Sequence, residues 1–464
     1  MLYARTRTDK IVYSFLAHPG RLIVLSFLFV ILLGSFLLAL PWATKEGTDF
    51  TYFDALFTAT SATCVTGLIV ADTQTTFTVF GKIVLICLIQ IGGLGLVTIT
   101  SMFMTFTGRK IGLKTKRLAL ESAGSFSYSE LPILLKFIFG VTFGCEALGA
   151  VFLSIAYVPI FGMKQGIIKA SFQSISAFCN AGFDLMGNSS GGPYSSLTSV
   201  GDNPLALITT SCLILFGGLG FIVWVDIASY AKKRSIRPHS KIMLKATLLL
   251  LVIGMVLVLI FEWSNTLKDL PFGEKLLASM FQSVTYRTAG FNSIDLGAMT
   301  PASKTFAIIL MFIGAGAGST GGGIKVTVFL IVLYMMISEF KGEDDVLVSK
   351  ARISMKLCHR AVAIFISGIT VVFLLSIILF ITEAPLVEAG KITHLDLVFE
   401  SVSAFATVGV TSAGTPQLSF WGHLFISPGM FLGRVGPITF ALSAYKDHKS
   451  KINKVYPDAK INIG

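Results

Sequence analysis

Charged residues are scarce in this sequence, and their scarcity excludes most soluble folds. They make up 13% of the 464 residues, whereas hydrophobic residues make up 53%, and the mean hydropathy is +0.78. Such a composition lies outside the range of soluble globular domains and is typical of a protein that crosses a membrane many times. We therefore expect no separate soluble domain, and in particular no nucleotide-binding domain, within this chain.

Cysteine and reactive clusters are equally sparse. The six cysteines include no C-x-x-C pair, so neither a disulfide framework nor a zinc site is indicated. We find no paired carboxylates, nucleophile arrangement or metal cluster, which argues against an enzyme and against a cofactor bound by this chain. A cleavable signal peptide is not expected, because the first apolar run, 22–40, is long enough to span a bilayer and is not followed by a small-residue cleavage pattern.

Basic residues outnumber acidic ones, and their placement explains the net charge of +12. Most of the 37 Lys and Arg residues fall into five segments: 1–21, 107–127, 231–245, 337–360 and the tail from 446. An even number of predicted membrane crossings separates these segments, so the positive-inside rule places all of them on the cytoplasmic side. The charge therefore indicates topology rather than a nucleic-acid partner. We predict a multi-pass protein of the cytoplasmic membrane with both termini in the cytoplasm.

A short pattern recurs four times along the chain, at 57–68, 172–183, 281–291 and 399–410. Each copy has a short amphiphilic run followed by a turn that ends in glycine. Such a helix cannot span a bilayer, which needs about 20 apolar residues, yet apolar spans stand on both sides of it. We therefore predict that each copy enters the membrane and returns. The predicted spans are 22–40, 83–106, 132–158, 205–230, 242–263, 306–337, 362–381 and 424–445.

The predicted fold is an all-α polytopic membrane protein with four span/re-entrant-loop/span repeats around a pseudo-fourfold pore. The proposed segments are a cytoplasmic N-terminus, four pore repeats and a cytoplasmic tail: 1–21, 22–107, 128–231, 242–340, 359–445 and 446–464. A second motif supports this alignment, because each returning span carries a small-residue cluster at 92–95, 217–220, 314–316 or 433–436.

The four turns are the candidate selectivity filter. A pore that carries a dehydrated cation must replace the lost water with oxygens, and inward-facing backbone carbonyls do this. Glycine permits the required backbone angles, and the short helices direct their negative C-terminal ends toward the ion. The alternative that glycine only allows close helix packing explains one position better than four matched ones. The candidate residues, with potassium at their carbonyls, are Val65, Thr66, Gly67, Asn180, Ala181, Gly182, Thr288, Ala289, Gly290, Thr407, Val408 and Gly409.

A glycine-rich segment interrupts the third returning span. It contains G-x-G-x-x-G, but a dinucleotide site needs that motif between a strand and a helix, which a membrane span does not provide. So many glycines make a continuous helix costly, and irregular backbone at membrane depth survives only where it is buried or lines water. We predict an intramembrane gating loop formed by Gly314, Gly316, Ala317, Gly318, Ser319, Thr320, Gly321, Gly322, Gly323 and Lys325.

Several charged residues lie within the predicted membrane region, where charges usually face a cavity or a partner. Arg434 is the candidate electrostatic barrier to cations in the pore. For Lys325, a barrier and a buried structural pair stay open. We interpret Arg287 as a tie between pore helices through carboxylates such as Glu400. Asp54 either attracts cations at the outer mouth or caps a helix.

These motifs carry a family resemblance. The four turns, Q-S-V-T-Y-R-T-A-G-F at 282–291 and G-A-G-S-T-G-G-G-I-K at 316–325 resemble the Trk/Ktr/HKT superfamily of potassium transporters over nearly the whole chain. The first repeat starts near the N-terminus, which is similar to the Ktr-type membrane subunit, KtrB. The resemblance implies potassium uptake by a homodimer regulated by a cytosolic KtrA-like ring that binds ATP or ADP, with sodium as a candidate stimulating ion.

An alternating-access cation symporter is the competing function. Such carriers usually show inverted repeats with broken helices at the bilayer midplane, whereas the four repeats predicted here share one orientation. The sequence therefore favours a gated potassium-conducting protein. By resemblance, glycine rather than serine in the first turn, at Gly67, favours potassium over sodium.

Overall fold

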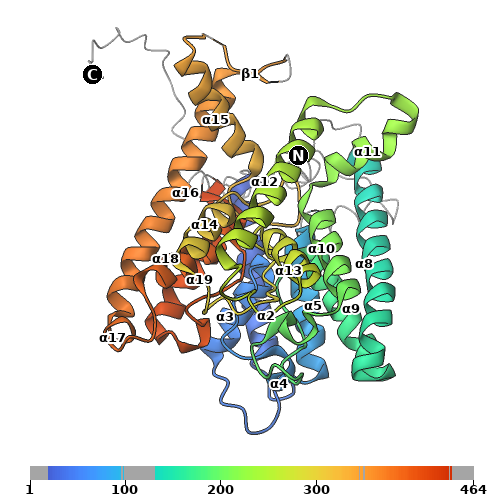
Figure 1. The fold of residues 1–464 in the computed structure, drawn as a ribbon, viewed down its shortest axis with the longest axis vertical. Coiled ribbons are helices and arrows are strands. Elements are labelled where there is room, and N and C mark those ends of the chain that lie inside the picture. The colour runs from blue at the N-terminus through green and yellow to red at the C-terminus, as the bar shows by residue number, and fades with distance from the viewer. Residues whose placement is uncertain are drawn as a thin grey trace, which may run out of the picture.

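A computed structural model describes residues 19–95, 98, 131–343, 345–348, 351–437, 439 and 440. The predicted basic loop 107–127, the tail 446–464 and nearly all of the N-terminal segment 1–21 lie outside these residues. The described part of the chain is almost entirely helical (Figure 1). Its one antiparallel hairpin joins two-residue strands, β1 (Leu347–Val348) and β2 (Ala351–Arg352). A helical fold is what the sequence predicted.

The helices follow the same order four times: a long helix, a short helix and a returning helix. The long helices are α2 (Pro19–Leu38), α8 (Leu131–Phe161), α12 (Pro238–Glu262) and α16 (Met355–Thr382). The short helices are α3 (Tyr52–Cys64), α9 (Met163–Cys179), α13 (Phe272–Thr285) and α18 (His394–Ala406). The returning helices are α5 (Val79–Leu94), α10 (Pro204–Gly218), α14 (Pro301–Phe312) and α19 (Phe420–Val435).

Two further helices continue returning segments, namely α11 (Phe221–Lys233) after α10 and α15 (Val326–Phe340) after α14. The small elements α4 (Thr73–Thr76), η1 (Ser196–Val200), α17 (Ala384–Glu388) and η2 (Thr415–Gln417) complete the described chain. Figure 1 shows α4 and α17 at one end of the molecule, which we call the mouth face. The hairpin and α11 lie at the opposite end, which we call the hairpin face.

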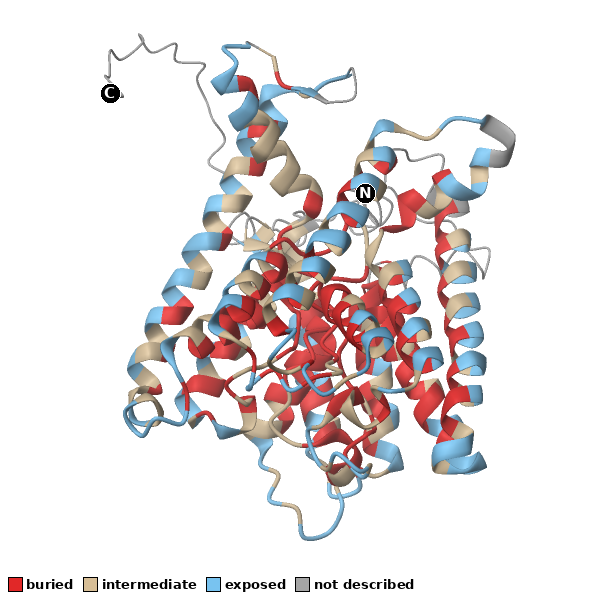
Figure 2. Ribbon diagram, in the orientation of Figure 1, coloured by how far each residue is buried: buried red, intermediate tan, exposed pale blue. Residues whose placement is uncertain are grey.

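The four long helices are each long and apolar enough to cross a membrane. They match the first predicted span of each repeat, and the chain is accordingly a multi-pass membrane protein. Figure 2 shows the complementary burial pattern: buried residues gather at the centre, and exposed residues lie along the outer faces of α8 and α16. Exposed apolar side chains on such helices are expected where lipid rather than water surrounds them.

The third returning segment is interrupted by its glycine-rich loop, as the sequence predicted. In the other three repeats the returning helix ends sooner than predicted among the described residues, at Leu94, Gly218 and Val435. The chain bends by 98° between α10 and α11, so the predicted uninterrupted span 205–230 was wrong. Each of these helices ends because the next residue outside it, or the one after, is a glycine with a positive φ, and that backbone conformation does not continue an α-helix. These glycines are the last residues of three of the repeated clusters: Gly95, Gly220 and Gly436, with φ of +80°, +98° and +88°.

The same clusters explain how closely the returning helices approach the short ones. In three repeats a glycine lies against a carbonyl oxygen at the C-terminal end of the short helix. An added Cβ at Gly92, Gly217 and Gly433 would lie 2.1, 1.9 and 1.7 Å from the carbonyl oxygens of Thr63, Phe178 and Phe405. No side chain fits there, so these glycines fix the short helices against the returning ones.

Candidate functional site

Each of the four predicted turns follows the C-terminal end of a short helix. The first residue of every turn has a left-handed backbone: φ is 56° at Val65, 59° at Asn180, 70° at Thr288 and 51° at Thr407. Three of these four residues are β-branched, for which this conformation is strained by about 1–3 kcal/mol. Strain of this kind persists where the surroundings enforce it and gathers at functional sites.

The turns meet in a closed ring of glycines and carbonyls. An added Cβ at each turn glycine would approach the backbone oxygen of the middle residue in the next turn. The pairs are Gly67 with Ala181 O (2.7 Å), Gly182 with Ala289 O (3.2 Å), Gly290 with Val408 O (2.7 Å) and Gly409 with Thr66 O (1.9 Å). The order runs from the first repeat to the fourth and back to the first. Four bends far apart in sequence therefore contact one another in a cycle.

Buried hydroxyls support these turns, and the sequence analysis missed them. Ser61 Oγ accepts a hydrogen bond from the N–H of Gly67 at 3.1 Å, and Ser403 Oγ does the same for Gly409 at 3.1 Å. In the third repeat, Thr285 Oγ1 accepts from the N–H of Phe291 at 3.0 Å and donates to its carbonyl. In each case the hydroxyl stands six residues before the N–H, and that spacing was visible in the sequence.

Replacing Thr285 with valine tests this support. Valine keeps the shape but leaves the N–H and carbonyl of Phe291 without their shared partner, and such buried losses cost about 1–3 kcal/mol. We expect a clearly lower melting temperature in detergent. Thr305→Val is the control, since Thr305 is exposed and its hydroxyl donates only to Pro301 O within its own helix. Equal melting temperatures for the two variants would contradict the role given to Thr285.

A cavity of about 480 Å³ opens on the mouth-face side of the ring. All four turn glycines line it, together with four carboxylates, Asp72, Asp184, Asp295 and Asp396. All four carboxylates have partners. Asp396 forms an ion pair with Lys304 at 2.8 Å, Asp72 accepts from the N–H of Thr75 at 2.8 Å, and Asp295 accepts from the N–H of Gly297 at 2.9 Å.

Asp184 lies in the loop just after the second turn. Burial raises the pKa of its carboxyl to about 6, although the N–H of Met186 donates to it at 2.9 Å and opposes the rise. The neighbouring Asp72 raises this pKa further. Asp184 is therefore ionised at neutral pH and becomes protonated in mildly acidic conditions.

The predicted gating loop lies directly against the turns on the other side of the ring. It connects α14 to α15 without a helix, as predicted, and Gly314 N donates to Ile324 O at 2.9 Å across its neck. An added Cβ at Gly321 would lie 2.3 Å from Thr288 Oγ1, and one at Gly322 would lie 1.9 Å from Thr407 Oγ1. The loop therefore fills the space beneath the third and fourth turns.

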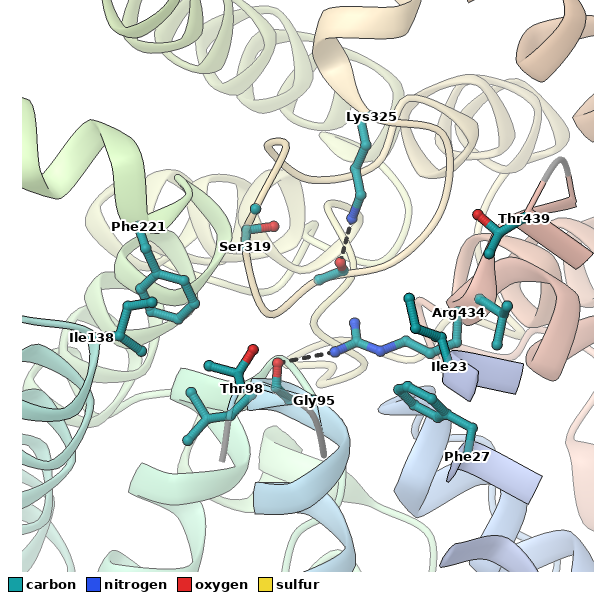
Figure 3. Close-up of a pocket in the computed structure, with 15 residues that line it drawn as sticks. Ile23, Phe27, Gly95, Thr98, Ile138, Phe221, Ser319, Lys325, Arg434 and Thr439 are labelled. Atoms are coloured by element: carbon teal, nitrogen blue, oxygen red, sulfur yellow. Dashed lines mark hydrogen bonds between the residues drawn. The ribbon is translucent and has the colours of Figure 1, made fainter. Parts of the chain in front are cut away.

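Arg434 and Lys325 both face a cavity of about 230 Å³ beneath the ring (Figure 3). The guanidinium of Arg434 donates to Thr320 O in the loop and to Gly93 O, at 3.0 Å, in α5. The ammonium of Lys325 donates to Gly321 O at 2.6 Å. Both predicted charges thus bond to backbone carbonyls around the loop. Neither forms an ion pair with a carboxylate among the residues that the structure describes.

The interpretation of Arg287 was wrong. Its guanidinium donates to Thr247 Oγ1 at 3.5 Å, and no ion pair joins it to Glu400 in the described part of the chain. Glu400 instead accepts from the hydroxyls of Thr411 and Thr415, which line the mouth cavity. Arg287 therefore contacts α12, whereas Glu400 contacts the loop after the fourth turn. Asp54 is a helix cap, since it accepts from the N–H and the hydroxyl of Thr51.

Known proteins share this sequence and fold. The chain matches the model of the TrkH family, described as cation transport proteins, over residues 8–456. It is 40% identical to the Ktr system potassium uptake protein B of Bacillus subtilis, over 98% of this chain and 99% of that protein. It is 37% identical to the potassium/sodium uptake protein NtpJ of Enterococcus hirae, over 96% of this chain and 97% of that protein.

Among solved structures, the potassium transporter TrkH from Vibrio parahaemolyticus superposes with a TM-score of 0.68, covering 90% of this chain and 84% of that one. At 18% identity this match supports the fold alone. The family model covers nearly the whole chain, and so does the first relative at well above 30% identity. A cation-transport family accords with the prediction of a protein that is not an enzyme. The chain belongs to the TrkH family of cation transport proteins, within the Trk/Ktr superfamily of potassium transporters.

Proposed function

We propose that this protein takes up potassium across the cytoplasmic membrane through the ring of four turns. The observation that carries the proposal is the cyclic approach of each turn glycine to a carbonyl of the next turn. A ring of this kind surrounds a single axis with backbone oxygens, which is what replaces the hydration shell of a monovalent cation. The names of the relatives, which refer to potassium uptake, agree with it.

Buried side-chain oxygens that have no hydrogen-bond partner in the described structure also support an ion site at the turns. Thr66 Oγ1, Thr407 Oγ1 and Asn180 Oδ1 are buried and make no hydrogen bond within the described structure. A buried polar atom normally has a partner, and a cation on the axis would supply one. Asn180 in the second turn therefore stands as a member of the ion site despite its departure from the threonines of the third and fourth turns.

In this proposal the loop 314–325 is the gate. Arg434 holds the loop in place and also acts as an electrostatic barrier to cations. Arg434 bonds to the loop at Thr320 and to the first repeat at Gly93, so it joins two sides of the conduction path. Its positive charge opposes the passage of a cation through that point. Release of Thr320 and withdrawal of the guanidinium would open the path.

We further propose that the hairpin face is cytoplasmic, because the described residues of the basic segments 231–245 and 337–360 lie at that end of the molecule. In the same proposal the working unit is a homodimer. Its cytoplasmic face contacts a KtrA-like ring, which is a separate polypeptide that binds ATP or ADP. The name of the Bacillus relative, a Ktr system protein, supports a multi-component system. The name of the Enterococcus relative mentions sodium beside potassium, which supports stimulation by sodium.

The test is cation flux through the purified protein in liposomes. We expect potassium-loaded vesicles to take up ⁸⁶Rb⁺ without ATP and without a sodium or proton gradient, with potassium and rubidium competing better than sodium. Empty liposomes are the control. Flux that strictly requires a sodium or proton gradient would favour an alternating-access symporter, and absence of alkali-cation flux in folded protein would contradict the proposal.

A pH dependence follows from Asp184. Its carboxylate is charged above about pH 6 and neutral below it, so a cation at the mouth loses attraction as the pH falls. We expect the KM for external potassium to rise severalfold between pH 7 and pH 5, since one unit charge at the mouth is worth roughly 1 kcal/mol. Asp184→Asn should have the high KM at both pH values.

The matched control for this effect is Asp202→Asn, an exposed carboxylate in the same loop region that does not line the cavity. It should keep the wild-type dependence of KM on pH. A wild-type KM for potassium that stays constant between pH 7 and pH 5 would contradict the role proposed for Asp184 in potassium entry.

A further inference from the structure

Helix α11 leaves the direction of the bundle. It follows α10 after a 98° bend, and the joint is Leu219–Gly220, where Gly220 has a φ of +98°. Figure 1 shows α11 at the hairpin face, beside the end of α8. A bend of this size gives α11 a direction that suits a helix lying along a membrane surface.

One side of α11 is apolar and partly exposed, with the Trp224 indole N–H donating to Phe216 O at 2.9 Å. Trp224 is half-buried, Ile227 is 37% exposed and Tyr230 is 50% exposed. Residues three apart share one side of a helix, so these three form a stripe on that side. Tryptophan and tyrosine favour the level of the lipid headgroups, where one end of the ring is in contact with water and the other with apolar surroundings.

Exposed cations continue this surface. Arg234 ends α11, and Lys241 and Lys245 project from the first turns of α12. The next exposed side chains on α12 are Leu248 and Leu249, so the hydrocarbon begins one turn beyond Lys245. The lysines therefore stand at headgroup height, where a basic side chain extends its charged end to the interface.

The start of α11 is fastened to the gating loop. Phe221 N donates to Gly318 O at 2.9 Å, and Gly316 N donates to Gly218 O at 2.8 Å. An added Cβ at Gly220 would lie 2.5 Å from Ala317 O. The far part of α11 is fixed to α12, because Asp226 accepts from Arg237 at 3.2 Å and from Ser240 at 2.6 Å. A displacement of α11 is therefore transmitted to the gating loop through the joint at Leu219–Gly220.

We propose that Arg234, Lys241, Lys245 and the stripe of Trp224, Ile227 and Tyr230 bind anionic phospholipid headgroups, and that this contact holds the loop in the position seen here. The charge favours anionic lipid, and the apolar stripe favours the membrane boundary over a water-exposed partner. The regulatory part rests on the proposed function of the loop as gate. A ligand stabilises the state that it binds, so anionic lipid holds the gate shut.

The first experiment measures ⁸⁶Rb⁺ flux in liposomes of phosphatidylcholine with rising phosphatidylglycerol. We expect flux to fall at least about tenfold by one-third phosphatidylglycerol, since each basic residue at a charged leaflet changes binding about fivefold. The triple variant R234Q/K241Q/K245Q should lose this dependence. K341Q/K356Q/R360Q removes the same charge from exposed positions at the same face, and it should keep the dependence.

Wild-type flux that is indifferent to phosphatidylglycerol would overturn the proposal and leave potassium conduction intact. Indifference combined with a response to an added cytosolic nucleotide-binding protein would assign the basic surface to that protein instead. If no lipid mixture gives flux, the proposed function fails, and the lipid contact is decided by fluorescence.

The fluorescence experiment uses the four tryptophans of the chain. W42F/W263F/W421F leaves Trp224 as the single reporter on α11. Brominated phosphatidylglycerol should quench it more strongly than brominated phosphatidylcholine, and R234Q/K241Q/K245Q in this background should abolish the difference. Equal quenching by the two lipids before that substitution would overturn the lipid assignment whatever the flux.

Discussion

Replacing Gly409 with serine is expected to abolish potassium flux while the protein still folds and inserts. A Cβ at this position would lie 1.9 Å from Thr66 O and 2.8 Å from Gly67 Cα. The new side chain must therefore displace the first turn, whose carbonyl belongs to the ring. We expect ⁸⁶Rb⁺ flux in liposomes to fall at least about 100-fold, which corresponds to about 2.8 kcal/mol of lost ion stabilisation.

The serine also introduces backbone strain, because Gly409 has a φ of +89°. Gly390→Ser separates the two effects: Gly390 has a φ of +68°, and an added Cβ there meets nothing within 4 Å. That variant carries similar strain without a clash and should conduct like the wild type. Normal flux through Gly409→Ser, or equal loss in both variants with intact folding, would show that the ring is not the conduction path.

Replacing Arg434 with glutamine is expected to raise flux. The guanidinium holds Thr320 of the loop and Gly93 of α5, and it places a full positive charge in the cavity beneath the ring. At an effective dielectric constant near 20, a unit charge about 6 Å from a passing cation opposes it by about 3 kcal/mol. We expect roughly a tenfold or greater increase in ⁸⁶Rb⁺ flux in vesicles without any regulatory partner.

Lys341→Gln is the control, because Lys341 is an exposed cation at the end of α15 and lies away from this cavity. It removes the same charge and should leave flux unchanged. If Arg434→Gln conducts no better than Lys341→Gln while remaining folded, the arginine has only a packing role. Lys325→Gln tests the loop separately, since Lys325 donates to Gly321 O but does not reach α5.

The repeat pattern predicted most of what brings the ring together. Copies of one short motif required four similar turns, and the structure places Gly67, Gly182, Gly290 and Gly409 side by side. The interrupted third span was also predictable, because glycine is a poor helix former and is concentrated there. What these residues do in transport stays a prediction, which the variants above address.

Long-range pairing could not be predicted, because it depends on which faces of the helices meet. Arg287 and Glu400 are both buried charges on neighbouring repeats, yet one bonds to α12 and the other to the mouth loop. Lys304 and Asp396 form the buried ion pair instead. The bend at Gly220 was missed because an apolar run of that length favours a straight span. Only the left-handed backbone of one glycine redirects it.

The four repeats differ, and under the proposed function this difference determines how the conduction path is closed. The glycine-rich loop occurs in the third repeat alone, yet it bonds to Phe178 of the second repeat and to Arg434 of the fourth. Four identical subunits would bring four copies of any such insertion to the same point, where they would collide. A fused chain can vary one quarter independently, so under the proposed function one asymmetric loop is enough to close the whole conduction path.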